Sequence, residues 1–138
     1  MSALERLPEV GERRIAVRMS DEARRWIRSG HPWLFADSIV STSGDGRPGD
    51  LAVVFDRKRR FQAIGLYDPT SPIRVRILHH GDPTPITPEW WEHRLRETIE
   101  RRRPLLDSSA TTGSRCVNGE NDGLPGLIVD RYAEVAMI

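Results

Sequence analysis

The chain has 138 residues, of which 38% are hydrophobic and 30% are charged. These values are typical of a folded globular protein and exclude a largely disordered chain. The longest apolar runs, such as residues 51–55, are far too short to span a bilayer, and the first residues do not resemble a signal peptide. The single cysteine, Cys116, excludes an internal disulfide bond. We therefore expect a cytoplasmic protein without membrane partners.

Positive charge is concentrated in the first part of the chain. Residues 13–80 contain 13 lysine and arginine residues against 7 acidic residues, a net charge of +6, whereas residues 81–138 carry −3. Only Lys58 among the 21 basic residues is a lysine. Arginine suits phosphate binding and base stacking, although the codon preference of a GC-rich genome would produce the same bias. The clustering of the charge, in contrast, favours a polyanionic partner.

Residues 13–80 are predicted to form short strands around one helix. Residues 13–18 have the alternating polarity of a strand. Ser20 is expected to cap a helix that ends near Gly30, with Ala23, Trp26 and Ile27 as its buried stripe. Further strands are predicted at residues 33–40, 51–55, 61–67 and 73–77. Five strands and one small helix predict a mainly β fold in the form of a small, partly closed barrel.

The rest of the chain is predicted to contain a proline-rich linker, one helix and the opening of an α/β domain. Thr87 is expected to cap a helix over residues 88–104 that Pro104 ends. Its inward stripe is expected to comprise Trp91, Leu95, Thr98 and Ile99. The expected parts of the chain are a leader at 1–12, a barrel at 13–80, a linker and helix at 81–107, and the start of an α/β domain at 108–138.

No catalytic constellation is complete in the sequence. There is no P-loop and no G-x-G-x-x-G motif, so we assign no catalytic, cofactor-binding or metal-ligating residue. His79 and His80 are adjacent, would face opposite sides of a strand, and are expected to be solvated or strand-end residues. His31 is predicted to face a ligand, although a packing corner formed with Pro32 and Trp33 is the alternative.

The strongest feature is that a helix, a hairpin tip and a strand each supply positive charge. Such surfaces neutralise phosphates and release counterions, although a merely solvated charged face is the alternative. Few aromatic residues lie among the basic ones, which favours structured RNA over a groove for stacked single strands. The predicted RNA-binding residues are Arg24, Arg25, Arg28, His31, Arg57, Lys58, Arg59, Arg60, Arg74 and Arg76.

Three segments resemble one bacterial enzyme family. SGHPWLF at residues 29–35 and GLYDPTSPIRVR at residues 65–76 resemble the PUA domain of the RlmI-type large-subunit ribosomal RNA (cytosine-5) methyltransferases. NGENDGLPGLIVDRY at residues 118–132 is similar to the segment that follows this domain in the family. The resemblance implies a PUA-like pseudo-barrel that binds structured RNA, followed by a linking helix and the beginning of an α/β domain.

The resemblance also implies a function for the complete enzyme. It would transfer a methyl group from S-adenosylmethionine to a cytosine of ribosomal RNA, and this chain would dock the RNA. We expect the cofactor loop and any attacking cysteine to lie beyond Ile138, so that residues 1–138 alone bind no cofactor. The alternatives are a stand-alone RNA-binding or ribosome-associated module, and a domain for protein contacts or dimerisation of an enzyme, with a homodimer left open.

Overall fold

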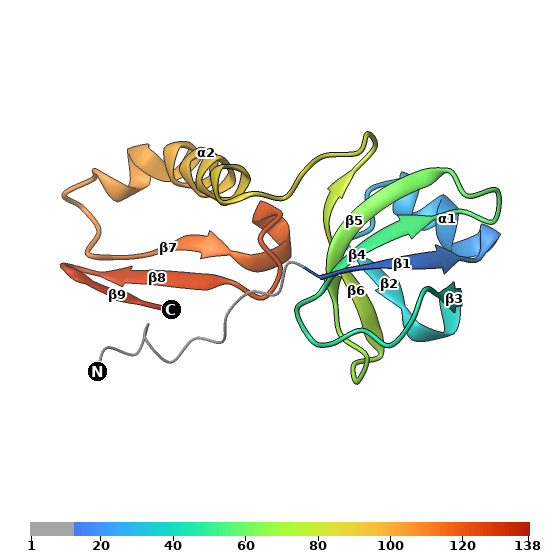
Figure 1. Cartoon of the computed structure of the whole chain (residues 1–138). Coiled ribbons are helices and arrows are strands. Elements are labelled where there is room, and N and C mark those ends of the chain that lie inside the picture. Colours follow the sequence, from blue (N-terminus) through green and yellow to red (C-terminus); the bar gives the residue numbers. More distant parts are fainter. Residues whose placement is uncertain (1–12) are drawn as a thin grey trace. The chain divides into compact units, whose positions relative to one another are not determined.

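The structure is a computed structural model that describes residues 13–138. It divides into two compact units, Met1–Pro83 and Thr84–Ile138, each of which is described by itself (Figure 1). The leader predicted at residues 1–12 lies outside the described residues.

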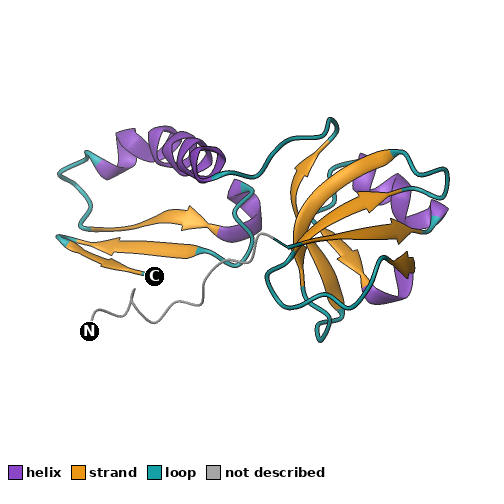
Figure 2. Ribbon diagram, in the orientation of Figure 1, coloured by secondary structure: helices purple, strands orange, loops and turns teal. Residues whose placement is uncertain are grey.

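The first unit is a six-stranded sheet that curls around one helix (Figure 2). The strands run in the order β2-β6-β5-β4-β1-β3, and β1 pairs with β4 in parallel while every other pair is antiparallel. The mainly β class and the PUA-like pseudo-barrel are therefore confirmed. The elements are β1 (Arg14–Met19), α1 (Asp21–Arg28), β2 (Trp33–Phe35), β3 (Ile39–Thr42), β4 (Leu51–Phe55), β5 (Phe61–Tyr67) and β6 (Ile73–His80).

The core of this unit comes from alternate residues of the strands. On β1, Ile15, Val17 and Met19 are buried while their neighbours face outward. The helix α1 adds Ala23 and Ile27, one turn apart. Burying each aliphatic side chain of this size contributes about 1.5–3 kcal/mol, so the period-two pattern is what fixes which face of the curled sheet is internal.

Two local predictions for this unit were wrong. Residues 33–40 are not one strand, because the 3-10 helix η2 (Ala36–Ser38) separates β2 from β3. The two short strands lie at opposite edges of the sheet, where β2 pairs with β6 and β3 pairs with β1, so a continuous strand could not serve both. Trp26 is 42% exposed, because Ala23 and Ile27 alone cover the core from this two-turn helix.

The second unit places α2 (Pro88–Leu106) beside a three-stranded antiparallel sheet (Figure 2). Thr87 caps the helix by accepting a hydrogen bond from the amide of Trp90 at 3.2 Å, as predicted. Of the predicted inward stripe, Thr98 is fully buried, whereas Ile99 is 39% exposed and was wrongly included. The sheet consists of β7 (Gly113–Asn118), β8 (Ile128–Tyr132) and β9 (Val135–Met137), and the 3-10 helix η3 (Gly119–Asp122) follows β7.

Pro104 lies inside α2, so the prediction that it ends the helix was wrong. A proline lacks one backbone N–H and therefore removes one helical hydrogen bond. Here it stands in the last turn, where the amide of Asp107 still donates to the carbonyl of Arg103 at 2.9 Å. The helix consequently continues to Leu106.

Asp122 organises the glycine-rich turn that follows β7. Its carboxylate is almost fully buried and lies 3.3 Å from the guanidinium of Arg101 and 2.9 Å from that of Arg102. It also accepts a hydrogen bond of 2.7 Å from the amide of Asn118. Gly123, at the end of η3, has a φ of 67° that favours glycine. The turn is therefore tied to α2 by a paired buried charge.

Candidate nucleic-acid interface

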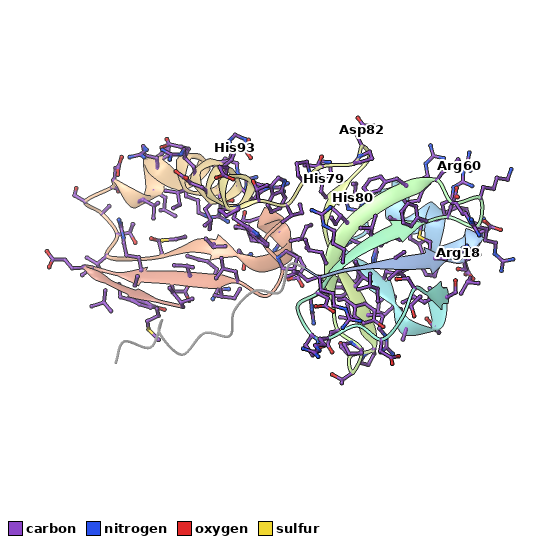
Figure 3. The ribbon with its side chains drawn as sticks, viewed as in Figure 1. Arg18, Arg60, His79, His80, Asp82 and His93 are labelled. Atoms are coloured by element: carbon purple, nitrogen blue, oxygen red, sulfur yellow. The ribbon has the colours of Figure 1, made fainter. Side chains whose placement is uncertain are left out.

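A basic groove of about 480 Å³ lies beside α1. Arg24, Ile27 and Arg28 line it from the helix, and further lining residues come from β5, β6 and the turn before β5. We call this the α1 groove. Figure 3 labels three of its residues, Arg60, His80 and Asp82. The other residues that line it are Phe61, Gln62 and Gly81.

The helix α1 presents its arginines because of how it is anchored. Ser20 caps it by accepting from the amide of Ala23 at 3.2 Å. Arg24 and Arg28 are four residues apart and therefore share the face that adjoins the buried Ile27. Neither arginine forms an ion pair or side-chain hydrogen bond with another residue of 13–138. Their guanidinium groups are thus available for an external anion.

The hairpin between β4 and β5 is built on a buried carboxylate. Asp56 accepts hydrogen bonds of 2.9 Å from the amides of Lys58 and Arg60. The Nε of Arg60 donates to the same carboxylate at 2.8 Å. Burial by itself would raise the pKa of the Asp56 carboxyl, but the hydrogen bonds and charge of Arg60 outweigh it and hold this pKa below its ordinary value. The hairpin is therefore held in shape by an aspartate that is charged at neutral pH.

The basic residues of this hairpin are exposed but not equivalent. Arg57 lies 3.7 Å from Asp21, and Arg60 is paired with Asp56. Lys58 and Arg59 form no ion pair among the described residues. Arg60 lines the α1 groove, whereas Arg57, Lys58 and Arg59 do not.

His80 lies at the end of β6 and lines the α1 groove. Burial lowers the pKa of its imidazole, and the neighbouring charge of His79 lowers it further, while a hydrogen bond with the backbone of Ile27 acts in the opposite direction. The ring is therefore neutral at pH 7. Its Nδ1 atom is buried and has no hydrogen-bond partner within the described part of the chain. His80 adds a polar but uncharged group between the arginines.

The remaining predicted residues lie elsewhere on the barrel. Arg25, Arg74 and Arg76 are not among the residues that line the α1 groove. His31 belongs to an aromatic cluster, with its ring centroid 6.1 Å from that of Trp33 and 6.0 Å from that of Phe35. Its Nδ1 lies 3.0 Å from the carbonyl oxygen and 3.2 Å from the amide nitrogen of Trp33. This arrangement supports the packing alternative for His31.

Apart from Ile27 of α1, five residues of the groove were not among the predicted RNA-binding residues: Phe61, Gln62, His80, Gly81 and Asp82. They follow the basic tip of the hairpin or come at the end of β6, so only the curl of the sheet brings them to α1. The adjacent histidines were the one signal in the sequence. His80 is the last residue of β6, as the strand-end alternative predicted, and it is half-buried rather than solvated.

No helix of residues 13–138 has both the length and the apolar character needed to cross a membrane. No three histidine, cysteine, aspartate or glutamate side chains of this range are placed to hold a metal ion. In the α1 groove, positive charge from the helix converges with that from the hairpin.

Comparison with known sequences shows which proteins this chain resembles. A family model for the PUA-like domain matches residues 17–80. The chain is 49% identical over 129 residues to a ribosomal RNA large subunit methyltransferase of Deinococcus radiodurans, covering 91% of this chain and 32% of the relative. It is 32% identical over 109 residues to ribosomal RNA large subunit methyltransferase I of Pseudoalteromonas translucida, covering 79% and 28%. The chain therefore spans about a third of the length of these curated relatives.

Comparison with solved structures confirms the fold. A "putative sam-dependent methyltransferase" from Streptococcus mutans superimposes with a TM-score of 0.73 at 14% sequence identity. The match covers 88% of this chain and 31% of that protein. A second methyltransferase structure, complexed with SAH, has the same TM-score at 13% identity.

Proposed function

We propose that this chain, which is similar to ribosomal RNA large subunit methyltransferases over most of its length and matches a PUA-like domain at residues 17–80, docks structured ribosomal RNA for such an enzyme. The complete enzyme would use S-adenosylmethionine to methylate a cytosine of the docked RNA. Residues 13–138 contain no strand that leads through a glycine-rich turn into a helix, the element that holds the cofactor in Rossmann-like domains. We therefore assign no cofactor contact to this chain.

The observation that carries the proposal is the α1 groove. Arg24 and Arg28 have no carboxylate partner among the described residues, although the first turn of the helix that carries them is acidic. Unpaired guanidinium groups on one face attract phosphates, and each phosphate bound releases condensed counterions. A groove of this kind binds the backbone of folded RNA more readily than it reads a base sequence.

One observation favours a second function, a contact with another protein. Trp26 is exposed in a hollow of about 650 Å³ that Phe35 and Pro72 also line. Glu22 and Asp37 line the same hollow, and their negative charge would repel RNA. A binding surface that joins an exposed aromatic residue to acidic ones suits a basic protein partner.

The test is the salt dependence of RNA binding by the double variant Arg24→Gln/Arg28→Gln. Losing two phosphate contacts should reduce the slope of log K against log salt by about two units and weaken binding to unrelated structured RNAs alike. The matched control is Arg96→Gln/Arg103→Gln, which changes the net charge equally on α2, where both arginines are paired with glutamates. Equal slopes for the wild type and the α1 variant would refute the docking role of the groove.

A further inference from the structure

A second hollow, of about 320 Å³, lies on the outer face of β1, β3 and β4. We call it the β1 hollow. It shares no lining residue with the α1 groove. The lining residues that determine its chemical character are Ala16, Arg18, Ser41, Ser43, Phe55 and Arg59.

Strand register explains why this hollow exists. Arg18 lies opposite Ser41 on β3 and opposite Phe55 on β4, so three different side chains stand in one row across three strands. Neighbouring strands are about 5 Å apart, which places these side chains in mutual reach. Ala16 is two residues earlier on the same outward face and contributes only a methyl group. The small residue leaves space on a surface that larger side chains surround.

The walls of the β1 hollow combine an aromatic ring with cations that have no internal partner. Phe55 is half-buried, and its ring centroid lies 6.4 Å from that of Phe61 in an edge-to-face arrangement of 84°. Neither Arg18 nor Arg59 forms an ion pair with another residue in the part of the chain that is described. Arg59 is held with a φ of 60° by the hairpin, whose Asp56 carbonyl accepts from its amide at 3.0 Å.

The hairpin at residues 56–60 divides its basic side chains between two sites. Arg59 lines the β1 hollow together with Phe55, whereas Arg60 lines the α1 groove together with Phe61. The Phe55–Phe61 pair therefore lies between the two sites. An RNA whose backbone occupies the α1 groove can continue past the hairpin tip to the β1 hollow.

We propose that the β1 hollow receives one unpaired nucleotide of the RNA that the α1 groove docks, a proposal that rests on the docking function above. The ring of Phe55 provides a surface for base stacking, and Arg18 and Arg59 face the flanking phosphates. Ser41 offers a hydroxyl to the base edge or the ribose. The volume is at the lower end of the range for small-ligand sites, which fits a single nucleotide and excludes a helix. The two positive charges of Arg18 and Arg59 disfavour the binding of an apolar peptide.

The test compares two RNA hairpins that differ at one position, using residues 1–138. One hairpin has a single bulged adenosine, and the other has an abasic residue in its place. Stacking of one base on one aromatic ring corresponds to an affinity ratio of about tenfold, so the wild type should prefer the bulged base by about that factor. Equal affinity for the two RNAs would overturn the proposal, while retained RNA binding would leave the docking function intact.

Two variants should each abolish this preference. Phe55→Leu removes the ring, and Ala16→Leu fills the hollow from an exposed position while retaining the ring. Thermal melts would show whether Phe55→Leu unfolds the barrel. If it does, Ala16→Leu still tests the proposal. A preference that survives in Ala16→Leu would overturn the proposal.

A free mononucleotide would offer the β1 hollow the same base and phosphate groups as the bulged RNA. Adenosine 5′-monophosphate should displace the bulged RNA only weakly and should shift the amide resonances of β1 and β3 only at high concentration, because it lacks the contacts in the α1 groove. Tight binding of the mononucleotide, with no shift of these resonances by the bulged RNA, would make the hollow a small-molecule site and overturn the RNA assignment.

Discussion

The guanidinium of Arg60 is bound to the buried carboxylate of Asp56 by two contacts of 2.8 Å, one from Nε and one from a terminal nitrogen. The two residues are the first and last of the hairpin between β4 and β5, and Asp56 is only 1% exposed. The guanidinium of Arg60 therefore stabilises the hairpin through Asp56 whether or not a ligand is bound. Part of its positive charge is neutralised, so it should contribute less to phosphate binding than Arg24 or Arg28.

We predict that Asp56→Asn lowers the melting temperature of the first unit by several degrees. The amide oxygen can still accept from the backbone amides of Lys58 and Arg60, but the NH2 group that replaces Oδ2 cannot accept from the Arg60 guanidinium, whose charge is left unpaired. Thermal unfolding followed by circular dichroism would measure the loss. Asp45→Asn is the matched control, because that aspartate is exposed in the loop before β4. Equal melting temperatures for the two variants would contradict the structural role of Asp56.

For the strand arginines we predict a smaller effect on RNA binding than for the helix arginines. Arg74 and Arg76 do not line the α1 groove, so Arg74→Gln/Arg76→Gln should reduce affinity less than Arg24→Gln/Arg28→Gln does. Both residues lie near the surface, where substitutions usually cost less than about 0.5 kcal/mol of stability. Filter binding at two salt concentrations would rank the variants. An equal or larger loss from the strand variant would place the main RNA site on β6.

Asp122→Asn should destabilise the second unit by about 1–3 kcal/mol. The carboxylate is paired with Arg101 and Arg102, and the figure is at the low end for buried ion pairs because Arg101 remains 60% exposed. Urea unfolding followed through the amide signals of α2 would report this loss. Glu134→Gln provides the comparison, because Glu134 is exposed in the turn between β8 and β9. If the urea midpoint did not change, the glycine-rich turn would not depend on this pair.

His80 should make the stability of the first unit depend on pH below neutrality. Its pKa in the folded protein lies below the ordinary value of 6.5, so as pH falls the unfolded chain takes up a proton before the folded one. Stability is therefore fully present above about pH 6.5 and decreases as pH falls toward the lower folded pKa. Melting temperatures between about pH 7.5 and about pH 5.5 should fall less for His80→Gln than for the wild type. A parallel fall in both proteins would exclude His80 as the cause.

Features that depend on local sequence could be predicted, whereas features that depend on the curl of the sheet could not. The caps at Ser20 and Thr87 follow from side chains that satisfy nearby amides, and β4 and β5 follow from short apolar runs on either side of a basic turn. The exposure of Trp26 depends on what the sheet places beneath α1. The same holds for His80 and Phe61, which reach the α1 groove only through strand pairing.

The order of the strands has a consequence for synthesis on the ribosome. β1 emerges first, yet its neighbours in the sheet are β3 and β4, and β2 pairs only with β6, which ends at His80. A nascent chain that stops short of β6 therefore leaves β2 without a partner and the apolar interior open to solvent. Ribosomes add roughly 5–20 residues per second, so this vulnerable state persists for seconds in every molecule made. The barrel cannot close strand by strand, and its completion must follow the release of the whole first unit from the exit tunnel.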